Sequence, residues 1–248
     1  MLTVTPTGAV LGATIEGADL ARPLRESDFA QVLAALGRHG VLRFPDQHLD
    51  SRALKVFAER FGDIQGSISG SSGHDPDVPE VGFLSNIMEN GRYIGLADAG
   101  QDWHTDMSYR DVMGFVNVLY GVTVPRRDGT VLGGTEFSNM HAAYEGLPAD
   151  VRVRLRDATA LHDFEKFWEH MRRDKASQLQ DTYRYVHTWT ERDVLVWDHF
   201  GTIHRAIADY GPDEYRLMKR CQVMATKILD PEFVRGALSE QVPAHAAR

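Results

Sequence analysis

The apolar residues of the N-terminal part follow a helical spacing in two places. Between Phe29 and Leu36 they recur every three or four positions, and the same spacing returns further along the chain. Gly40 is suited to end the first helix, and Asp50 is suited to cap the second. The pattern therefore predicts a helix over 26–38, a buried strand over 41–44 and a second helix over 51–61.

After residue 112 the apolar positions form short runs that are typical of strands. Gly, Ser, Asp and Pro dominate 64–78, and 87–101 is equally irregular, so both stretches are predicted to be loops. Strands are predicted within the first 20 residues and over 81–85, 112–122, 130–137, 182–189, 193–198 and, with a break, 216–228. Helices are predicted over 139–146, 164–175 and 148–156, where Pro148 suits a first helical turn although alternating arginines also fit a strand. The sum is a β-rich core with helices packed outside it.

Composition and charge narrow the class of protein. The chain has 248 residues, of which 43% are hydrophobic and 25% charged, and these globular values exclude disordered and fibrous classes. Its one cysteine, Cys221, excludes an intramolecular disulfide and a cysteine-rich zinc site. The net charge of −8 disfavours nucleic acid or an anionic membrane as a partner. The sequence has neither a long apolar run nor the pattern of a secretory signal, so we expect a cytoplasmic protein.

The segment around His104 and Asp106 carries the first candidate chemistry. In an extended segment residues i and i+2 point to one side, so this imidazole and this carboxylate can converge on a metal ion. A distant histidine would complete the set of two histidines and one carboxylate that binds ferrous iron and leaves coordination positions open. A second His-x-Asp occurs at His48 and Asp50, where the aspartate also suits a helix cap. The pattern alone leaves both pairs open.

Further polar residues follow the apolar segments near the C-terminus. An apolar strand ending near Trp197 leads through a short turn to His204, and Arg216 and Arg220 follow. On a strand the two guanidinium groups share one face and can hold a carboxylate, although two exposed arginines on an edge strand fit equally well. Thr135 comes after two glycines and offers a hydroxyl to a carboxylate, or the glycines simply form a turn or bulge.

Taken together and in order, these segments resemble the taurine dioxygenase family of iron(II)- and 2-oxoglutarate-dependent oxygenases. The most specific match is the run Trp103-His104-Thr105-Asp106-Met107-Ser108-Tyr109. Supporting matches lie at 11–20, 40–47, 57–62, 133–135 and 195–198. The match covers most of the chain, so it implies one domain over 1–248.

The resemblance implies a fold and a set of roles. The fold would be of the β-rich α+β class, a double-stranded β-helix or cupin-like jelly roll with flanking helices. His104, Asp106 and His204 would bind iron(II), and Arg216, assisted by Thr135, would hold the far carboxylate of 2-oxoglutarate. With O2, such a site oxidises a C–H bond of a small molecule and releases succinate and CO2. Relatives often self-associate, so the resemblance is compatible with a homo-oligomer.

Two departures from the family pattern concern the co-substrate and the substrate. The spacing from His204 to Arg216 is one residue longer than in the family, so Arg220 remains an alternative anchor for 2-oxoglutarate. The stretch 157–181 stands where relatives carry a longer insert that covers the substrate. The identity of the substrate therefore stays open, and an anionic group would suit Arg220. The other candidate contacts are Asn86, Trp103 and Tyr109.

Two other functions fit the residues without the resemblance. A metal-dependent β-barrel oxygenase or isomerase would need no keto acid, and a non-catalytic β-sandwich would only bind a metal or ligand. Dependence of turnover on 2-oxoglutarate separates the first from the predicted enzyme. A change of absorption on adding iron(II) and 2-oxoglutarate without oxygen separates the second.

Overall fold

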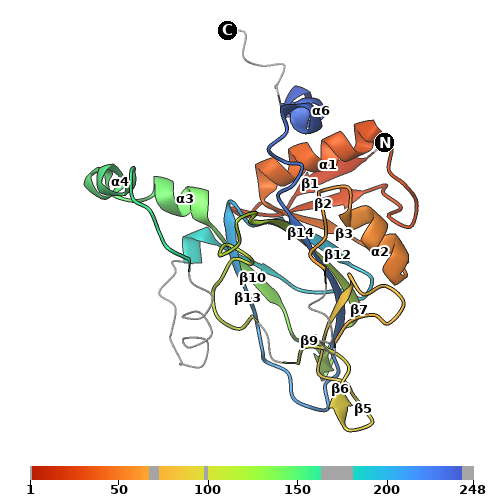
Figure 1. The fold of residues 1–248 in the computed structure, drawn as a ribbon. Coiled ribbons are helices and arrows are strands. Elements are labelled where there is room, and N and C mark those ends of the chain that lie inside the picture. Colours follow the sequence, from red (N-terminus) through yellow and green to blue (C-terminus); the bar gives the residue numbers. More distant parts are fainter. Residues whose placement is uncertain (1, 67–72, 98–99, 163–180, 242–248) are drawn as a thin grey trace.

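The computed structural model describes residues 2–66, 73–97, 100–162 and 181–241 and folds them into two main sheets with helices outside (Figure 1). The larger sheet has the strand order β1-β2-β3-β12-β7-β14-β4, and the smaller sheet has the order β11-β10-β13. The pair β2–β3 is parallel, whereas the strands around β7 and β10 pair antiparallel. Two sheets of mainly antiparallel strands agree with the predicted jelly roll.

The elements have the following bounds. The larger sheet comprises β1 (Thr3–Pro6), β2 (Ala13–Glu16), β3 (Val41–Phe44), β4 (Gly82–Ser85), β7 (Gly114–Thr123), β12 (Val194–Asp198) and β14 (Leu217–Met224). The smaller sheet comprises β10 (Thr135–Asn139), β11 (Arg184–His187) and β13 (Thr202–Ala206). Two small hairpins are formed by β5 (Met88–Glu89) with β6 (Arg92–Tyr93) and by β8 (Arg126–Arg127) with β9 (Thr130–Val131). The helices are α1 (Glu26–His39), α2 (Ser51–Ala58), α3 (Met140–Glu145), α4 (Ala149–Leu155), the 3-10 turn η1 (Asp181–Tyr183) and α6 (Pro231–Gln241).

Strand β7 lies in the interior of the larger sheet because it is apolar on both faces. Phe115, Val116, Val118 and Leu119 are all buried, and the strand pairs with β12 on one side and β14 on the other. An antiparallel strand with one wet face alternates apolar and polar residues, whereas this strand is covered on both sides. Asn117 interrupts the apolar run, and its side chain belongs to the site described below.

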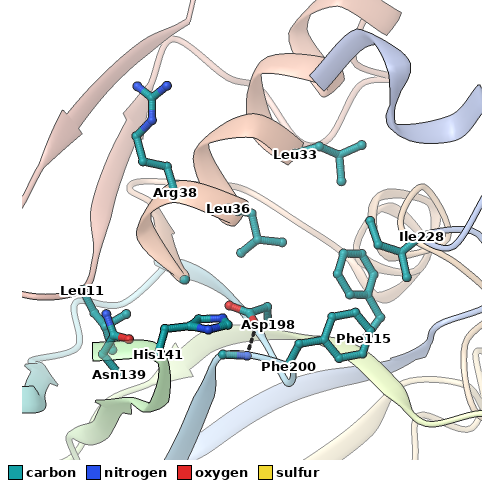
Figure 2. Close-up of a pocket in the computed structure, with 13 residues that line it drawn as sticks. Leu11, Leu33, Leu36, Arg38, Phe115, Asn139, His141, Asp198, Phe200 and Ile228 are labelled. Carbon is teal, nitrogen blue, oxygen red and sulfur yellow. Dashed lines mark hydrogen bonds between the residues drawn. The ribbon is translucent and has the colours of Figure 1, made fainter. Parts of the chain in front are cut away.

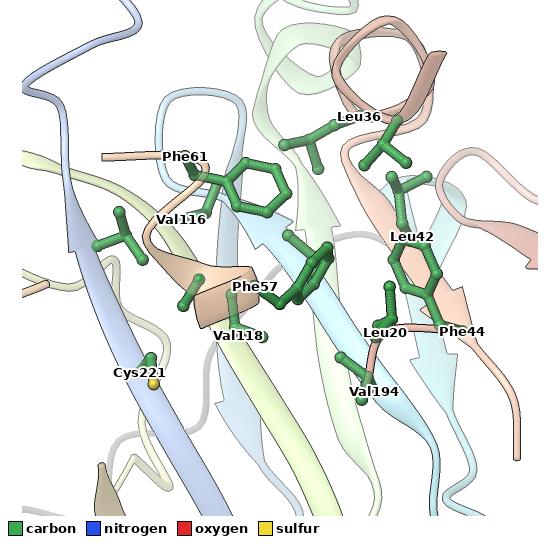
Figure 3. Close-up of a cluster of buried hydrophobic side chains, with 14 of the residues drawn as sticks. Leu20, Leu36, Leu42, Phe44, Phe57, Phe61, Val116, Val118, Val194 and Cys221 are labelled. Carbon is green, nitrogen blue, oxygen red and sulfur yellow. The ribbon is translucent and has the colours of Figure 1, made fainter. Parts of the chain in front are cut away.

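The helices α1 and α2 cover the outer face of the larger sheet. Figure 3 shows side chains of both helices, including Leu36 and Phe57, packed together with residues of the sheet strands. The rings of Phe29 and Phe61 meet edge to face at 5.0 Å, and Phe44 of β3 meets Phe57 at 5.6 Å. Aromatic pairs in this geometry stabilise the layer beyond their buried area. This packing fixes the larger sheet from outside.

A second apolar cluster fills the space between the two sheets. Leu119, Trp197 and Met218 come from the larger sheet, Phe137 comes from the smaller sheet, and Trp189 follows β11. The ring of Phe137 touches that of Trp197 edge-on, with 5.4 Å between their centroids. Because a packed interior resists deformation, the two sheets form a rigid frame for the polar side chains that point into the same space.

Backbone geometry confirms several predicted boundaries. Helix α1 ends at Gly40, whose φ of 66° is the left-handed conformation that favours glycine. Asp50 caps α2 by accepting a hydrogen bond of 2.7 Å from the N–H of Ala53. Helix α4 begins directly after Pro148, so the helical interpretation of this segment is confirmed.

The structure differs from the predicted elements in a few places. The stretch 87–101 contains the hairpin β5–β6, whose turn residues Asn90 and Gly91 both have positive φ. The predicted strand over 130–137 divides into β9 and β10 around Gly133, where φ is 68°. The pattern predicted neither β13 nor α6, and the predicted helix over 164–175 lies outside the described residues. In the described part of the chain, no helix is long and apolar enough to cross a membrane.

Candidate metal and co-substrate site

Backbone hydrogen bonds bring His104 and His204 together. The N–H of each residue donates to the C=O of the other, at 3.0 and 2.8 Å, so the segment before β7 lies against β13. The N–H of Ala206 extends this contact by donating to the C=O of Gly100 at 2.6 Å. Asp106 follows two residues after His104, and its carboxylate turns toward both imidazoles, as the i, i+2 spacing predicts.

The side chains of His104, Asp106 and His204 converge on one point. One potential ligand atom of each lies within 4.8 Å of the others. Nε2 of His104 is 3.6 Å from one carboxylate oxygen of Asp106, and Nε2 of His204 is 4.0 Å from the other. These separations are too long for hydrogen bonds, so the three groups surround a common space. Among the described residues, this is the one cluster of three potential metal ligands.

The electrostatics of Asp106 and His204, two members of the triad of His104, Asp106 and His204, favour the protonation states that a metal requires. Burial alone would raise the pKa of Asp106, but positively charged neighbours, His104 first and Arg220 among them, outweigh burial and hold this pKa well below its usual range. Burial, and then the charge of His104, lower the pKa of His204. A charged carboxylate and a neutral imidazole are the forms that bind divalent metals. The donor set therefore fits ferrous iron.

Two hydrogen bonds orient the triad. Nδ2 of Asn117, a fully buried residue of β7, donates to Oδ2 of Asp106 at 2.6 Å. Nδ1 of His104 lies 2.7 Å from the carbonyl oxygen of Asp102, so Nδ1 carries the proton and Nε2 faces the other ligands. Asn117 is absent from the sequence-based candidates because an amide inside an apolar strand carries no local signature.

A further histidine, His199, lies beside the triad. Its ring centroid is 6.0 Å from that of His204, and its carbonyl oxygen accepts a hydrogen bond of 3.2 Å from Oγ1 of Thr105. The side chain is buried, and within the described part of the chain neither ring nitrogen has a hydrogen-bond partner. Burial lowers the pKa of His199 to about 4, so this ring is neutral near pH 7.

Arg216 is a buried cation without an acidic partner among the described residues. Its side chain is 6% exposed, and its Nε has no hydrogen-bond partner. Burial lowers the pKa of Arg216, and the group that opposes this shift is Tyr210, whose ring centroid lies 6.0 Å from the guanidinium carbon. A buried guanidinium is unfavourable unless a carboxylate or comparable anion pairs with it. The arginine therefore fits a dicarboxylate such as 2-oxoglutarate.

Thr135 begins β10 and is also buried. It lies on the same strand face as Phe137, which pairs with His204 across the smaller sheet, so its side chain points toward the larger sheet. Its Oγ1 accepts a hydrogen bond of 3.0 Å from Nε1 of Trp189. Trp189 was not a sequence-based candidate, since nothing local to it indicates a polar role.

The remaining arginine and asparagine candidates take different positions. Arg220 lies within electrostatic reach of the triad, because its charge lowers the pKa values of Asp106 and His199. The amide of Asn86 donates to the carbonyl oxygens of the turn before β14, and its oxygen accepts from the N–H of Arg216 at 2.8 Å. Asn86 therefore fixes the backbone of Arg216 and uses its polar atoms to do so.

The aromatic candidate Trp103 packs against two arginines. The guanidinium groups of Arg205 and Arg184 sit over the ring of Trp103, at 5.1 and 5.7 Å from its centroid. Both arginines also pair with Glu136 on the outer face of the smaller sheet, so Trp103 packs on that face. Tyr109 is 40% exposed. The role of Tyr109 as a substrate contact stays a prediction.

The alternative metal-binding pair, His48 and Asp50, has a structural role instead. Asp50 caps α2, and His48 is an exposed residue whose Nε2 lies 3.6 Å from a carboxylate oxygen of Asp46. No third ligand from the described residues joins His48 and Asp50. The structure therefore favours the pair His104 and Asp106 over this one.

A separate cavity of about 400 Å³ lies on the other side of the turn between β12 and β13 (Figure 2). Leu33 and Leu36 of α1 line it from above, and Asp198 and His141 lie close together at its floor. Asp198 is adjacent to Trp197 on β12, so its side chain points to the opposite face from the inner cluster. The cavity is therefore distinct from the triad, although both adjoin the same turn.

Comparison with known proteins gives one family and several relatives. The profile of the taurine catabolism dioxygenase TauD, TfdA family matches residues 3–178. Pentalenolactone F synthase from Streptomyces avermitilis is 27% identical over 282 aligned residues, which cover 86% of this chain and 90% of that protein. The (S)-phenoxypropionate/alpha-ketoglutarate-dioxygenase from Delftia acidovorans is 34% identical over 172 residues, covering 65% of this chain and 54% of that protein. The first alignment is longer than this chain of 248 residues, so that relative has segments that this chain lacks.

Solved structures confirm the fold. A taurine dioxygenase from Burkholderia xenovorans superposes with a TM-score of 0.68 at 24% identity, over 90% of this chain and 89% of that chain. A structure of AAD-2 in complex with Mn(II) and N-oxalylglycine superposes with a TM-score of 0.69 at 21% identity, over 92% and 98% of the two chains. The predicted jelly-roll architecture is therefore correct.

Proposed function

The chain belongs to the taurine catabolism dioxygenase TauD, TfdA family, and from that premise we propose a role for each polar group around the triad. It is a 2-oxoglutarate-dependent dioxygenase that uses iron(II) and acts on a small molecule. The observation that supports the assignment of roles is the triad of His104, Asp106 and His204 together with the buried guanidinium of Arg216, which has no acidic partner among the described residues.

His104, Asp106 and His204 hold the iron ion. Asp106 supplies an anionic oxygen and His204 a neutral nitrogen, and the hydrogen bond from Asn117 fixes the orientation of the carboxylate. When bound, iron(II) and 2-oxoglutarate supply the oxidation of a substrate C–H bond by O2, with succinate and CO2 as by-products.

Arg216 and Thr135 hold the far carboxylate of 2-oxoglutarate. Both side chains are buried, so water does not compete for their hydrogen bonds. The carboxylate neutralises Arg216, which has no acidic partner among the described residues, and this pairing orients the keto acid toward the triad. Asn86 stabilises this arrangement, because its side-chain oxygen accepts a hydrogen bond from the backbone N–H of Arg216.

Arg220 selects the substrate. The effect of its charge on Asp106 and His199 supports a position of the guanidinium within electrostatic reach of the triad. A cation in this position attracts and orients a small organic anion. Several relatives are named after carboxylates or sulfate esters, which supports an anionic substrate. We therefore propose a carboxylate, sulfonate or sulfate ester of low molecular weight.

Succinate release from a panel of compounds tests this proposal. Organic acids and sulfonates are compared with their neutral amides, using wild type, Arg220→Gln and, as a control, Arg126→Gln at an exposed arginine of β8. We expect turnover of the anions only, and a KM about tenfold to a hundredfold higher in Arg220→Gln, the range for loss of a hydrogen bond to a charged group. Equal turnover of a neutral amide, or an unchanged KM, would contradict the role of Arg220.

A further inference from the structure

The hydroxyl of Thr135 is fixed by a tryptophan. Nε1 of Trp189 donates to Oγ1 of Thr135 at 3.0 Å, and both side chains are almost completely buried. An indole N–H can only donate, so Trp189 must be the donor and Thr135 the acceptor of this hydrogen bond. Thr135 accepts this hydrogen bond, and within the described part of the chain its hydroxyl donates to no other group.

The direction of this bond determines what the hydroxyl can bind. A threonine hydroxyl has one hydrogen to donate and two lone pairs to accept with. With a lone pair occupied by Trp189, the hydrogen rotates away from the indole and needs an acceptor elsewhere. A buried donor without an acceptor is unfavourable, so the arrangement points to an acceptor that the described residues do not supply. A carboxylate is such an acceptor and cannot donate in return.

Thr135 lies at a suitable distance from the triad for this task. It is two positions before Phe137 on the same face of β10, and Phe137 is the direct cross-strand neighbour of His204. Two residues of a strand span about 7 Å. This separation is comparable to the reach of a five-carbon dicarboxylate, so a keto acid held at the triad can present its far carboxylate to Thr135.

Trp189 is held rigidly from several sides. The ring of His187 meets it edge-on with 4.8 Å between centroids. The backbone of Gly121 approaches so closely that a Cβ atom there would lie 3.2 Å from Cε3 of the indole. The turn that follows is fixed by Asp193, which is buried and accepts a hydrogen bond of 3.0 Å from the N–H of Thr190. The donor therefore keeps its place without reorganisation.

We propose that Trp189 is a positioning residue that holds the Thr135 hydroxyl as a hydrogen-bond donor to the far carboxylate of 2-oxoglutarate. The inference rests on the proposed function, since it assumes that Thr135 binds this carboxylate. In this role Trp189 supports a residue that binds the co-substrate, and it favours keto acids that carry a second carboxylate. Keto acids without a far carboxylate gain nothing from a pre-oriented Thr135.

Binding of two keto acids to the iron(II)-loaded protein, measured by calorimetry without oxygen, tests the proposal. In Trp189→Phe the ring remains but the donor is lost. We expect 2-oxoglutarate to bind about three- to tenfold more weakly, the effect of one hydrogen bond, while the affinity for 2-oxobutyrate changes less than twofold. The ratio of the two affinities is the readout, because a general structural disturbance would weaken both keto acids.

Two further variants separate the hydrogen bond from packing. Trp197→Phe is the matched control, since Trp197 is buried in the same cluster and its Nε1 has no hydrogen-bond partner among the residues that the structure describes. It should leave the affinity ratio unchanged. In a Thr135→Val background, Trp189→Phe should have no additional effect on the ratio, because the hydroxyl through which Trp189 acts is gone.

The outcomes distinguish this inference from the proposed function. If Thr135→Val leaves the affinity for 2-oxoglutarate unchanged, Thr135 does not bind the co-substrate and that part of the proposed function fails. If Thr135→Val weakens binding but Trp189→Phe preserves the ratio, the function stands and the role of Trp189 is wrong. An equal loss in Trp197→Phe and Trp189→Phe would also overturn it.

Discussion

Single side chains that touch the triad or the arginines carry much of the organisation of the site. Asn117 donates to Asp106, and Asn86 accepts from the N–H of Arg216. The two asparagines have the same chemistry but serve different parts of the site. They therefore form a matched pair for testing which group of residues binds which ligand.

Asn117→Ala should weaken the binding of iron(II) without affecting the preference among keto acids. The amide orients a ligating carboxylate, and loss of such a partner lowers metal affinity about tenfold to a hundredfold. Calorimetric titration of the metal-free protein with iron(II) under nitrogen measures this change. Asn86→Ala should leave iron(II) affinity unchanged and weaken 2-oxoglutarate binding. The opposite pattern, or no change in either variant, would contradict the division of roles.

The residues that sequence analysis could and could not identify differ in a physical respect. His104 and Asp106 are two residues apart in an extended segment, so their spacing alone predicts that they share a side. Asn117 and Trp189 act through contacts with residues distant in sequence, and each lies among apolar neighbours that indicate only a buried strand or turn. Arg216 and Arg220 were both candidates for binding 2-oxoglutarate, and the sequence alone does not show that Arg216 is the buried one.

At the scale of elements, the turn between β12 and β13 lies between the inner apolar cluster and the cavity under α1. Trp197 faces the inner cluster, whereas Asp198 faces the cavity under α1, with His141 nearby and Arg38 at the rim (Figure 2). Burial raises the pKa of Asp198, although the N–H of Gly201 donates to its carboxylate at 2.6 Å and opposes the shift. A charged carboxylate is therefore destabilising in this turn near pH 7.

Asp198→Asn should change the stability of the protein in a pH-dependent way. Because the folded pKa is raised, protonation of Asp198 stabilises the fold below the unfolded pKa, and this contribution is lost as pH rises through the folded pKa. An asparagine keeps an acceptor for Gly201 and carries no charge. Urea unfolding should show similar stability of both proteins near pH 4 and greater stability of the variant at pH 7. A variant that is less stable at both pH values would refute this explanation.

The elements that the sequence predicted correctly are those with a strong local signal. Helices α1 and α2 combine a clear apolar period with end residues, Gly40 and Asp50, whose geometry the structure confirms. The hairpin β5–β6 had the signature Asn90-Gly91, but each strand is only two residues long and carries no period. β13 was not predicted because its residues are a mixture of apolar and polar types that only pairing with β10 explains.

At the scale of the whole molecule, the chain is shorter than relatives that it matches along most of their length. The alignment with pentalenolactone F synthase includes segments that are missing here, and the resemblance to the family predicts that the shortage lies before β12. The order of the motifs along the chain could be read from the sequence, whereas the pairing of β10 with β13 and of β14 with β7 could be expected only through the family resemblance. That arrangement follows from the pairing of strands that are far apart in sequence.

The most direct test of the account is an anaerobic titration with iron(II) and 2-oxoglutarate, followed by visible absorption. A keto acid that chelates protein-bound ferrous iron produces a charge-transfer band. We expect this band in the wild type and in His48→Ala, and its loss in His104→Ala and His204→Ala. Arg216→Ala should require a much higher concentration of 2-oxoglutarate to form it, whereas Arg220→Ala should not. Retention of the band in His104→Ala with loss in His48→Ala, or an unchanged titration in Arg216→Ala, would contradict the assigned site.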